Sequence, residues 1–269
     1  MLAIPVLASA APVAWGQDLP ALTKAIAQQY CRPTDDDLGG TRDAHLRVLR
    51  DAGETGRLAL LRVVASDPAN SNCALGYLVD LGDRRAIPYL RASLQDASNP
   101  DVAVALTGLA RLQDRESFEQ ILSYVGDPDA SRAAVLALGL LDDERARAAL
   151  RELMTAGRVA PSLAVRAMGW QRDASATQII VRASEAAAAR KDWLTVSETV
   201  TALARIRTVE SLRLAEVQFK AILPERWRIL AKSEAETALH AQLDAALTPE
   251  EQRAIQEALS LVGGWRDHK

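Results

Sequence analysis

The sequence of 269 residues is poor in aromatic residues, histidine and cysteine. Only 4% of its residues are aromatic, and it contains three histidines and two cysteines. So few cysteines exclude a disulfide-dense mini-protein, and the scarcity of aromatic and β-branched residues relative to Ala and Leu argues against a β-sandwich. The formal net charge of -3 argues against a generally basic nucleic-acid-binding protein. With 49% apolar residues the chain has enough material for a core, and its richness in Ala and Leu favours helices.

The first 16 residues contain no charged side chain and are typical of a secretory signal peptide. The run ends in small residues, and we expect cleavage after Gly16, with a second candidate site after Ala10. Two alternatives stay open. One is a membrane anchor, which normally needs about 20 apolar residues, and the other is an apolar N-terminal helix of the folded domain. We expect an exported protein, periplasmic or secreted, with no membrane span after signal removal.

Cys31 and Cys73 are the only cysteines in the sequence. In an exported protein an even number of cysteines favours a disulfide. This pair would close a loop of about 40 residues, worth about 3–4 kcal/mol in the loop-entropy model. The alternative is two separate thiols, one of them packed in a helix as a small apolar residue. Because no second Cys or His stands at ligand spacing from either residue, a metal site is disfavoured.

A short apolar motif recurs along the middle of the chain at spacings of 30 to 32 residues. Each clear copy is followed by a polar turn that contains an Asp and then by a second amphipathic stretch. The clear copies lie at 74–78, 105–109, 137–141 and 167–170, a weaker copy lies at 202–206, and the turn aspartates are Asp83, Asp114, Asp142, Asp143 and Asp173. The pattern predicts pairs of short helices, none stable alone, that bury their apolar faces against neighbouring pairs. The turn aspartates are expected to accept hydrogen bonds from the backbone of the next helix.

A proline stands ahead of each clear copy, and in three cases an Asp or Asn precedes it. The pairs are Asp67-Pro68, Asn99-Pro100 and Asp127-Pro128, and the fourth proline is Pro161. A capping residue followed by Pro at the first helical position is a helix-start signature, because Pro lacks an N–H that would be unpaired there. We therefore predict that the first helix of each pair begins at these prolines.

Residues 126–146 combine Asp-Pro, Arg-Ala-Ala, Ala-Leu-Gly and an Asp-containing turn in that order. This stretch resembles the HEAT-repeat family, in the short form of about 30 residues also called PBS-lyase-like HEAT repeats. The resemblance extends over about 58–215, and Arg132 and Arg166 match the family's helix-start arginine. It implies an all-α, right-handed α-solenoid of helical hairpins with a concave face for partners, and it implies little about chemistry.

The two ends of the chain do not repeat, and we interpret them as helical caps on the repeats. The N-terminal cap is 17–57 and the C-terminal cap is 216–269, and together with the repeats they are expected to form one elongated domain. Helices are predicted at 19–30, 41–52, 225–247 and 249–262, and the polar segment 32–40 is the best candidate for a flexible boundary.

The sequence contains no recognisable catalytic, cofactor-binding or metal-binding motif. His45, His240 and His268 are far apart, and the patterns of zinc proteases, nucleotide-binding loops and nucleophile elbows are missing. The acidic run 35–37 lacks the spacing of a calcium loop and is interpreted as a solvated loop. We predict no catalytic residues, no cofactor and no metal.

One stretch, 145–191, carries nine basic residues against three acidic ones. If these arginines share a face, they form a patch for an acidic protein, an anionic polymer or a lipid headgroup. The alternative is that they point in different directions and that several pair with the turn aspartates. Because Trp and Arg are enriched at interfaces, the candidate partner-binding residues are Arg147, Arg151, Arg182 and Trp193. Trp170 occupies an apolar repeat position and is expected in the core.

These observations favour a non-catalytic exported scaffold that binds a protein partner through a concave surface formed by the second helices of the repeats. One alternative is a lyase or chaperone-like enzyme, as the bilin-attaching members of the resembled family imply, and it needs a ligand pocket. Another is a binder of an anionic polymer through 145–191. HEAT-like DNA glycosylases use a basic concave surface, but export makes nucleic acid an unfavoured partner.

Overall fold

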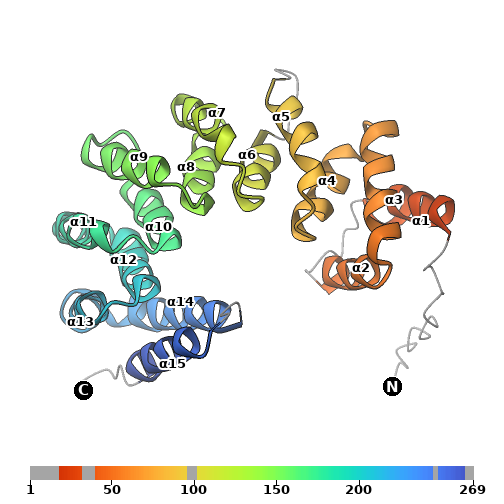
Figure 1. Cartoon of the computed structure of the whole chain (residues 1–269). Coiled ribbons are helices and arrows are strands. Elements are labelled where there is room, and N and C mark those ends of the chain that lie inside the picture. The colour runs from red at the N-terminus through yellow and green to blue at the C-terminus, as the bar shows by residue number, and fades with distance from the viewer. Residues whose placement is uncertain (1–17, 32–39, 96–101, 245–247, 264–269) are drawn as a thin grey trace, which may run out of the picture. The chain divides into compact units, whose positions relative to one another are not determined.

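The computed structural model describes residues 18–31, 40–95, 102–244 and 248–263, and over these ranges it is all-helical, without a strand. The predicted all-α class is confirmed. The expected signal peptide, the acidic run at 35–37, the pair at 99–100 and His268 lie outside the described residues. The chain divides into two compact units, unit 1 (1–104) and unit 2 (105–269), which are described separately below (Figure 1).

Unit 1 is built around its third helix. That helix, α3, contacts α1, α2 and α4. The elements of unit 1 are α1 (Leu19–Ala25), the π-helical turn η2 (Ile26–Tyr30), α2 (Gly40–Asp51), α3 (Gly53–Ser66), α4 (Ser71–Asp80), the 3-10 turn η3 (Arg84–Ala86) and α5 (Ile87–Gln95). The helices predicted at 19–30 and 41–52 are therefore present to within one residue, the first of them with a change to π-helical geometry.

A disulfide ties η2 to α4. Cys31, directly after η2, is bonded to Cys73 of α4, with an S–S distance of 2.02 Å. Beside the bond, the ring of Tyr30 stacks on the ring of His45 from α2, with centroids 4.0 Å apart. His45 Nδ1 lies 3.0 Å from the hydroxyl of Tyr77 in α4. The disulfide and this ring cluster together join three elements that are distant in the sequence.

Unit 2 consists of helix pairs whose first helices form one row and whose second helices form another (Figure 1). Each of the first helices α8, α10, α12 and α14 packs against the next, and the second helices pack beside them. Helix α6 (Val102–Arg111) spans the boundary between the units. The other elements are η4 (Arg115–Ser117), α7 (Phe118–Ser123), η5 (Tyr124–Gly126), α8 (Ser131–Leu140), α9 (Glu144–Thr155), α10 (Pro161–Gln171), η6 (Ala174–Ala176), α11 (Thr177–Ala189), α12 (Trp193–Ile206), α13 (Val209–Val217), η7 (Gln218–Ile222), α14 (Glu225–Asp244) and α15 (Pro249–Gly263). No helix in the described parts of the chain is long and apolar enough to cross a membrane.

Two copies of the recurring apolar motif lie at points where successive first helices touch. A Cβ atom on Gly139 of α8 would lie 2.7 Å from the Cα atom of Ala167 in α10. A Cβ atom on Gly169 of α10 would lie 2.7 Å from the Cα atom of Ala202 in α12. Both alanines are fully buried. In these two copies the motif pairs the glycine of one helix with an alanine of the next, so that the two backbones can approach closely.

Three of the four turns contain an Asp with the predicted structural role, whereas Asp114 makes no side-chain cap hydrogen bond. In three of the turns the Asp side chain accepts a hydrogen bond from the backbone N–H two residues later, at 2.9–3.0 Å. These residues are Asp83, Asp143 and Asp173. Each bond satisfies a donor at the start of the following helix that has no partner within the helix.

The predicted Asp-Pro helix starts are wrong. Pro128 lies in a turn, and α8 begins three residues later at Ser131. The Asp127 carboxylate accepts hydrogen bonds from the backbone N–H groups of Asp129 and Ala130, at 2.9 and 2.8 Å. This local side-chain turn satisfies the donors that a helix start would otherwise present, so the helix begins after it. The same offset precedes α4, and among the repeats with a described start α10 alone begins with its proline.

Candidate functional site

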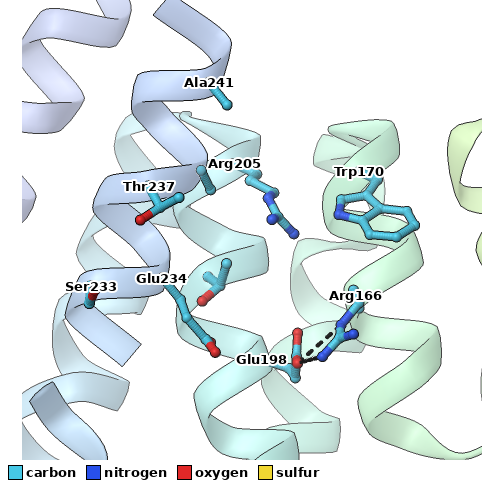
Figure 2. A pocket seen from close by; sticks show the side chains of 10 residues that line it. Arg166, Trp170, Glu198, Arg205, Ser233, Glu234, Thr237 and Ala241 are labelled. Atoms are coloured by element: carbon cyan, nitrogen blue, oxygen red, sulfur yellow. Dashed lines mark hydrogen bonds and ion pairs between the residues drawn. The ribbon is translucent and has the colours of Figure 1, made fainter. Parts of the chain in front are cut away.

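A hollow of about 400 Å³ lies on the first helices of unit 2, between α10, α12 and α14 (Figure 2). Its lining residues are Arg166, Trp170, Glu198, Thr201, Arg205, Ser233, Glu234, Thr237, Ala238 and Ala241. This position differs from the expectation that the second helices line the binding surface. The physical reason is that the second helices of this unit cover the other side of the row of first helices.

One wall of the hollow is an ion pair between α10 and α12. Arg166 Nε donates to Glu198 Oε1 at 3.1 Å, and the Nη2 of the same guanidinium donates to the same oxygen. Glu198 is only 4% exposed, so this arginine compensates a carboxylate that the fold has taken out of water. The hydrogen bonds to Glu198 raise the pKa of Arg166. The two charges therefore neutralise each other.

Arg205, from the last turn of α12, extends into the same space (Figure 2). Burial lowers the pKa of its guanidinium, and the nearby Glu198 carboxylate opposes that shift. Arginine stays protonated in proteins even so. The guanidinium carbon lies 5.9 Å from the centroid of the Trp170 ring. Within the described residues its side chain has no hydrogen-bonded or ion-paired acceptor, so its N–H groups remain available to a ligand.

Glu234, on α14, supplies the second carboxyl group of the hollow (Figure 2). Burial raises the pKa of this carboxyl, and repulsion from Glu198 raises it further, while Arg166 and Arg205 lower it. The hydroxyl of Thr201 is near enough to lower that pKa slightly, yet it is buried and makes no hydrogen bond of normal geometry with a described residue. The hollow thus holds two arginines and two carboxyls, of which one arginine and one carboxyl are already paired.

Trp170 stands at the junction of the hollow with two adjoining depressions, and it lines all three. Its side chain is half-buried, so the expectation that it belongs to the core is wrong. The cause is its position next to Gly169. Because Gly169 faces α12 directly, the next residue along the helix is rotated by about 100° towards the open side of the row.

Arg147 and Arg151, both predicted to bind a partner, lie on α9 and are already paired. Arg147 is bonded to Asp142 and to Glu144, the latter at 3.1 Å. Arg151 is bonded to Asp173 at 2.5 Å and to Glu144 at 3.1 Å. Hydrogen bonds from the two arginines lower the pKa of Glu144. The structure brings these two candidate residues together, but in a network of ion pairs that neutralises their charges.

The other two predicted residues do not join them in a site. Arg182 is exposed on α11, and Trp193 is the half-buried first residue of α12. Neither lines the hollow. At least five of the nine basic residues of 145–191 are ion-paired to carboxylates of the described chain, so this stretch is not a free positive patch. The five are Arg145, Arg147, Arg151, Arg158 and Arg166.

The residues that sequence reasoning missed are Glu198, Arg205 and Glu234. A signal for the first two exists, since they are the charged residues of α12, a helix whose other residues from Thr195 to Ala204 are buried apolar or hydroxyl side chains. A charged side chain within such a helix needs a partner or a function. Glu234 carries no comparable signal, because α14 is rich in charged residues throughout.

The described residues include no group of three or more His, Cys, Asp or Glu side chains suited to a metal ion. What the lining residues offer is recognition chemistry: a guanidinium, an aromatic ring, a protonatable carboxyl and hydroxyls. No protein-family model matches the sequence, and no curated protein matches it either.

Proposed function

We propose that this protein is a non-catalytic, exported interaction scaffold of the HEAT-like solenoid kind, and that it binds a protein partner through the hollow on α10, α12 and α14. The solenoid is supported by the stacking of successive first helices through one repeated Gly–Ala contact. In such repeats each unit packs on its neighbours and leaves an extended row of helices for partners. Export is supported by the Cys31–Cys73 disulfide, because disulfides persist in oxidising compartments.

The observation that carries the binding proposal is Arg205 beside Trp170. Its half-buried guanidinium has no acceptor among the residues that the structure describes, which is unusual because buried polar groups are almost always hydrogen-bonded. Arg and Trp are also the side chains that contribute most at the centres of protein interfaces. A bound partner would supply the missing acceptor and complete the burial of both side chains.

Site-specific photo-crosslinking in the native compartment tests this surface. A photoreactive amino acid placed at Thr237, an exposed residue at the hollow, is expected to crosslink a partner protein. The matched control carries the same amino acid at Arg182, which is exposed on α11 and lies outside the hollow. Equal crosslinking from both positions, or crosslinking from Arg182 alone, would contradict the proposal.

Export has its own test, which is the mass of the native protein. We expect an N-terminus at Gln17 and a mass lower by two hydrogens than that of the fully reduced chain, because the disulfide removes two thiol protons. An intact N-terminus with two free thiols would contradict export while leaving the binding surface in place.

Binding of an anionic polymer through 145–191 is less well supported, because most arginines of that stretch are neutralised by carboxylates of the same chain. It predicts that affinity for heparin falls steeply with salt. A lyase or chaperone-like enzyme needs a reactive constellation in the hollow, and the lining side chains include no nucleophile hydrogen-bonded to a base.

A further inference from the structure

We propose that the hollow is a receptor for a carboxylate on a peptide segment of the partner, with the carboxylate bound by Arg205 and an adjoining peptide N–H bound by Gln242. This inference rests on the proposed function and names the chemistry that the surface recognises. Four observations support it, from Arg205, Trp170, Gln242 and the charge balance of the hollow.

Arg205 supplies the donors. A guanidinium presents its N–H groups as a planar fork that matches the two oxygens of a carboxylate. In Figure 2 the side chain projects from α12 into the hollow. No described residue supplies an acceptor for it, whereas the other arginine of the hollow, Arg166, is fully engaged with Glu198.

Trp170 supplies an apolar face beside the fork. Its ring lies 5.9 Å from the Arg205 guanidinium carbon, within the range in which an aromatic ring attracts a cation. The guanidinium is also half-buried. A hydrogen bond formed there is stronger than one formed in bulk water, because the local dielectric is lower.

Gln242 supplies the acceptor for a second contact. It lines the depression that adjoins the hollow, together with Trp170 and Arg205. Its Nε2 donates a long hydrogen bond of 3.4 Å to the backbone carbonyl of Arg205. The Oε1 is then buried and has no donor among the described residues, and the residue as a whole is only 8% exposed. Because this oxygen has almost no accessible surface, a peptide N–H reaches it only once the side chain of Gln242 turns towards the depression, where the peptide backbone supplies the missing donor.

The charge of the hollow favours a carboxylate over a phosphate. Glu198 and Glu234 stand near Arg205, and their carboxyls act against any additional negative charge. A carboxylate brings one negative charge and places it on the fork, whereas a phosphate brings up to two. Only one guanidinium is available to receive it, because Arg166 is paired. The site therefore fits a singly charged, planar anion.

The test uses the full chain and four probes. They are acetyl-trialanine with a free C-terminal carboxylate, acetyl-Ala-Asp-Ala-amide, acetyl-trialanine-amide and inorganic phosphate. Binding is followed by NMR through the Nε–H signal of Arg205 and the indole N–H signal of Trp170. We expect at least one of the two carboxylate peptides to shift both signals and the uncharged peptide to leave them unchanged. The comparison of the two carboxylate peptides shows whether a C-terminus or an acidic side chain is preferred.

Three variants and a control assign the contact. Arg205→Gln is expected to lower the affinity for the carboxylate peptide by about 10- to 100-fold, as for loss of hydrogen bonds to a charged group. Arg205→Lys keeps the charge but loses the fork, and is expected to weaken binding as well. Gln242→Leu removes the amide oxygen and is expected to weaken binding with Arg205 in place. Arg182→Gln, outside the hollow, removes an equal charge and is expected to leave affinity unchanged, and circular dichroism reports whether each variant is folded.

The proposal is overturned if neither carboxylate peptide shifts the two signals, if the uncharged peptide shifts them as strongly, or if phosphate alone binds. A folded Arg205→Lys variant with unchanged affinity also overturns it. These outcomes are separate from a failure of the proposed function. Crosslinking from Thr237 without peptide binding retains the partner surface and rejects the carboxylate, whereas peptide binding without crosslinking retains the receptor and rejects the scaffold.

Discussion

Substitution of Gly169 by Ala tests the close helix contact on which the packing of unit 2 depends. The added Cβ would lie 2.7 Å from both the Cα and the Cβ atoms of Ala202, whereas carbon atoms in contact normally lie about 3.5–4.0 Å apart. Neither neighbouring atom can move by a side-chain rotation, so α10 and α12 must separate. Because the added atom meets backbone that cannot give way, we expect the upper part of the range typical of overpacking, about 2–3 kcal/mol. Replacing Gly by Ala within a helix returns up to about 1 kcal/mol. We therefore expect a net loss of about 1–2 kcal/mol.

The assay is denaturant unfolding followed by circular dichroism at the helix band, with the midpoint compared at constant slope. A loss of this size corresponds to a lower melting temperature by roughly 3–6 °C for a unit of this size. Gly139→Ala, which meets Ala167 in the same way, is expected to behave alike. Gly126→Ala is the matched control, because no atom lies within 4 Å of its added Cβ.

A Gly169→Ala protein as stable as the wild type, or more stable, would contradict this prediction. That outcome would mean that helix propensity outweighs the contact and that the two helices are not held at the distance described. A loss in the Gly126→Ala control as large as in the variant would likewise remove the contact as the explanation.

Three further predictions concern the disulfide and the charged groups of the hollow. Reduction of the Cys31–Cys73 bond should lower the stability of unit 1 by about 3–4 kcal/mol. A double Cys→Ala variant should be as unstable as the reduced protein and insensitive to reductant. Equal stability of the wild type with and without reductant would contradict this prediction. Arg166→Met should lower the free energy of unfolding by about 2–3 kcal/mol, because it leaves Glu198 without its ion-pair partner. This value already includes a discount for the one-third exposure of the arginine. A free energy of unfolding within about 0.5 kcal/mol of wild type, the size of a neutral surface change, would contradict the prediction. Since the pKa of Glu234 is raised above its ordinary 4.5, its stabilising contribution is complete below that value and declines as pH rises through the raised pKa. The melting temperature of wild type relative to that of Glu234→Gln should fall with rising pH, and a rise would contradict the prediction.

The helices themselves were predictable from the sequence because their signals are local. The spacing of the apolar motif places the first helices at α4, α6, α8, α10 and α12, and the terminal helices also lie where they were expected. The turn aspartates could be assigned because Asp83, Asp143 and Asp173 bond to an N–H only two residues away. The error at Asp127-Pro128 is local too, since a side-chain turn and a helix cap compete for the same backbone donors.

The candidate site was not predictable, because its residues are joined by packing and not by spacing. Arg147 and Arg151 are basic in sequence, but whether they are free depends on carboxylates such as Asp173 that come close only when the repeats stack. Trp170 was assigned to the core because it continues an apolar motif. The fold turns it to the open side, where it meets Arg205 of the next first helix.

The formation of short helices in pairs follows from the sequence, because the interactions that form them are local. Each backbone hydrogen bond of a helix spans four residues, and the Asp of a turn bonds to an N–H only two residues away. Which charges are neutralised and which stay available depends on how the helices pack. Desolvation and ion pairing depend on distances between side chains of different helices, and those distances are set by how closely Gly139, Gly169 and their alanine partners let the helices approach. The position of Arg205 beside Trp170, without an acceptor in the described part of the chain, is a product of that packing.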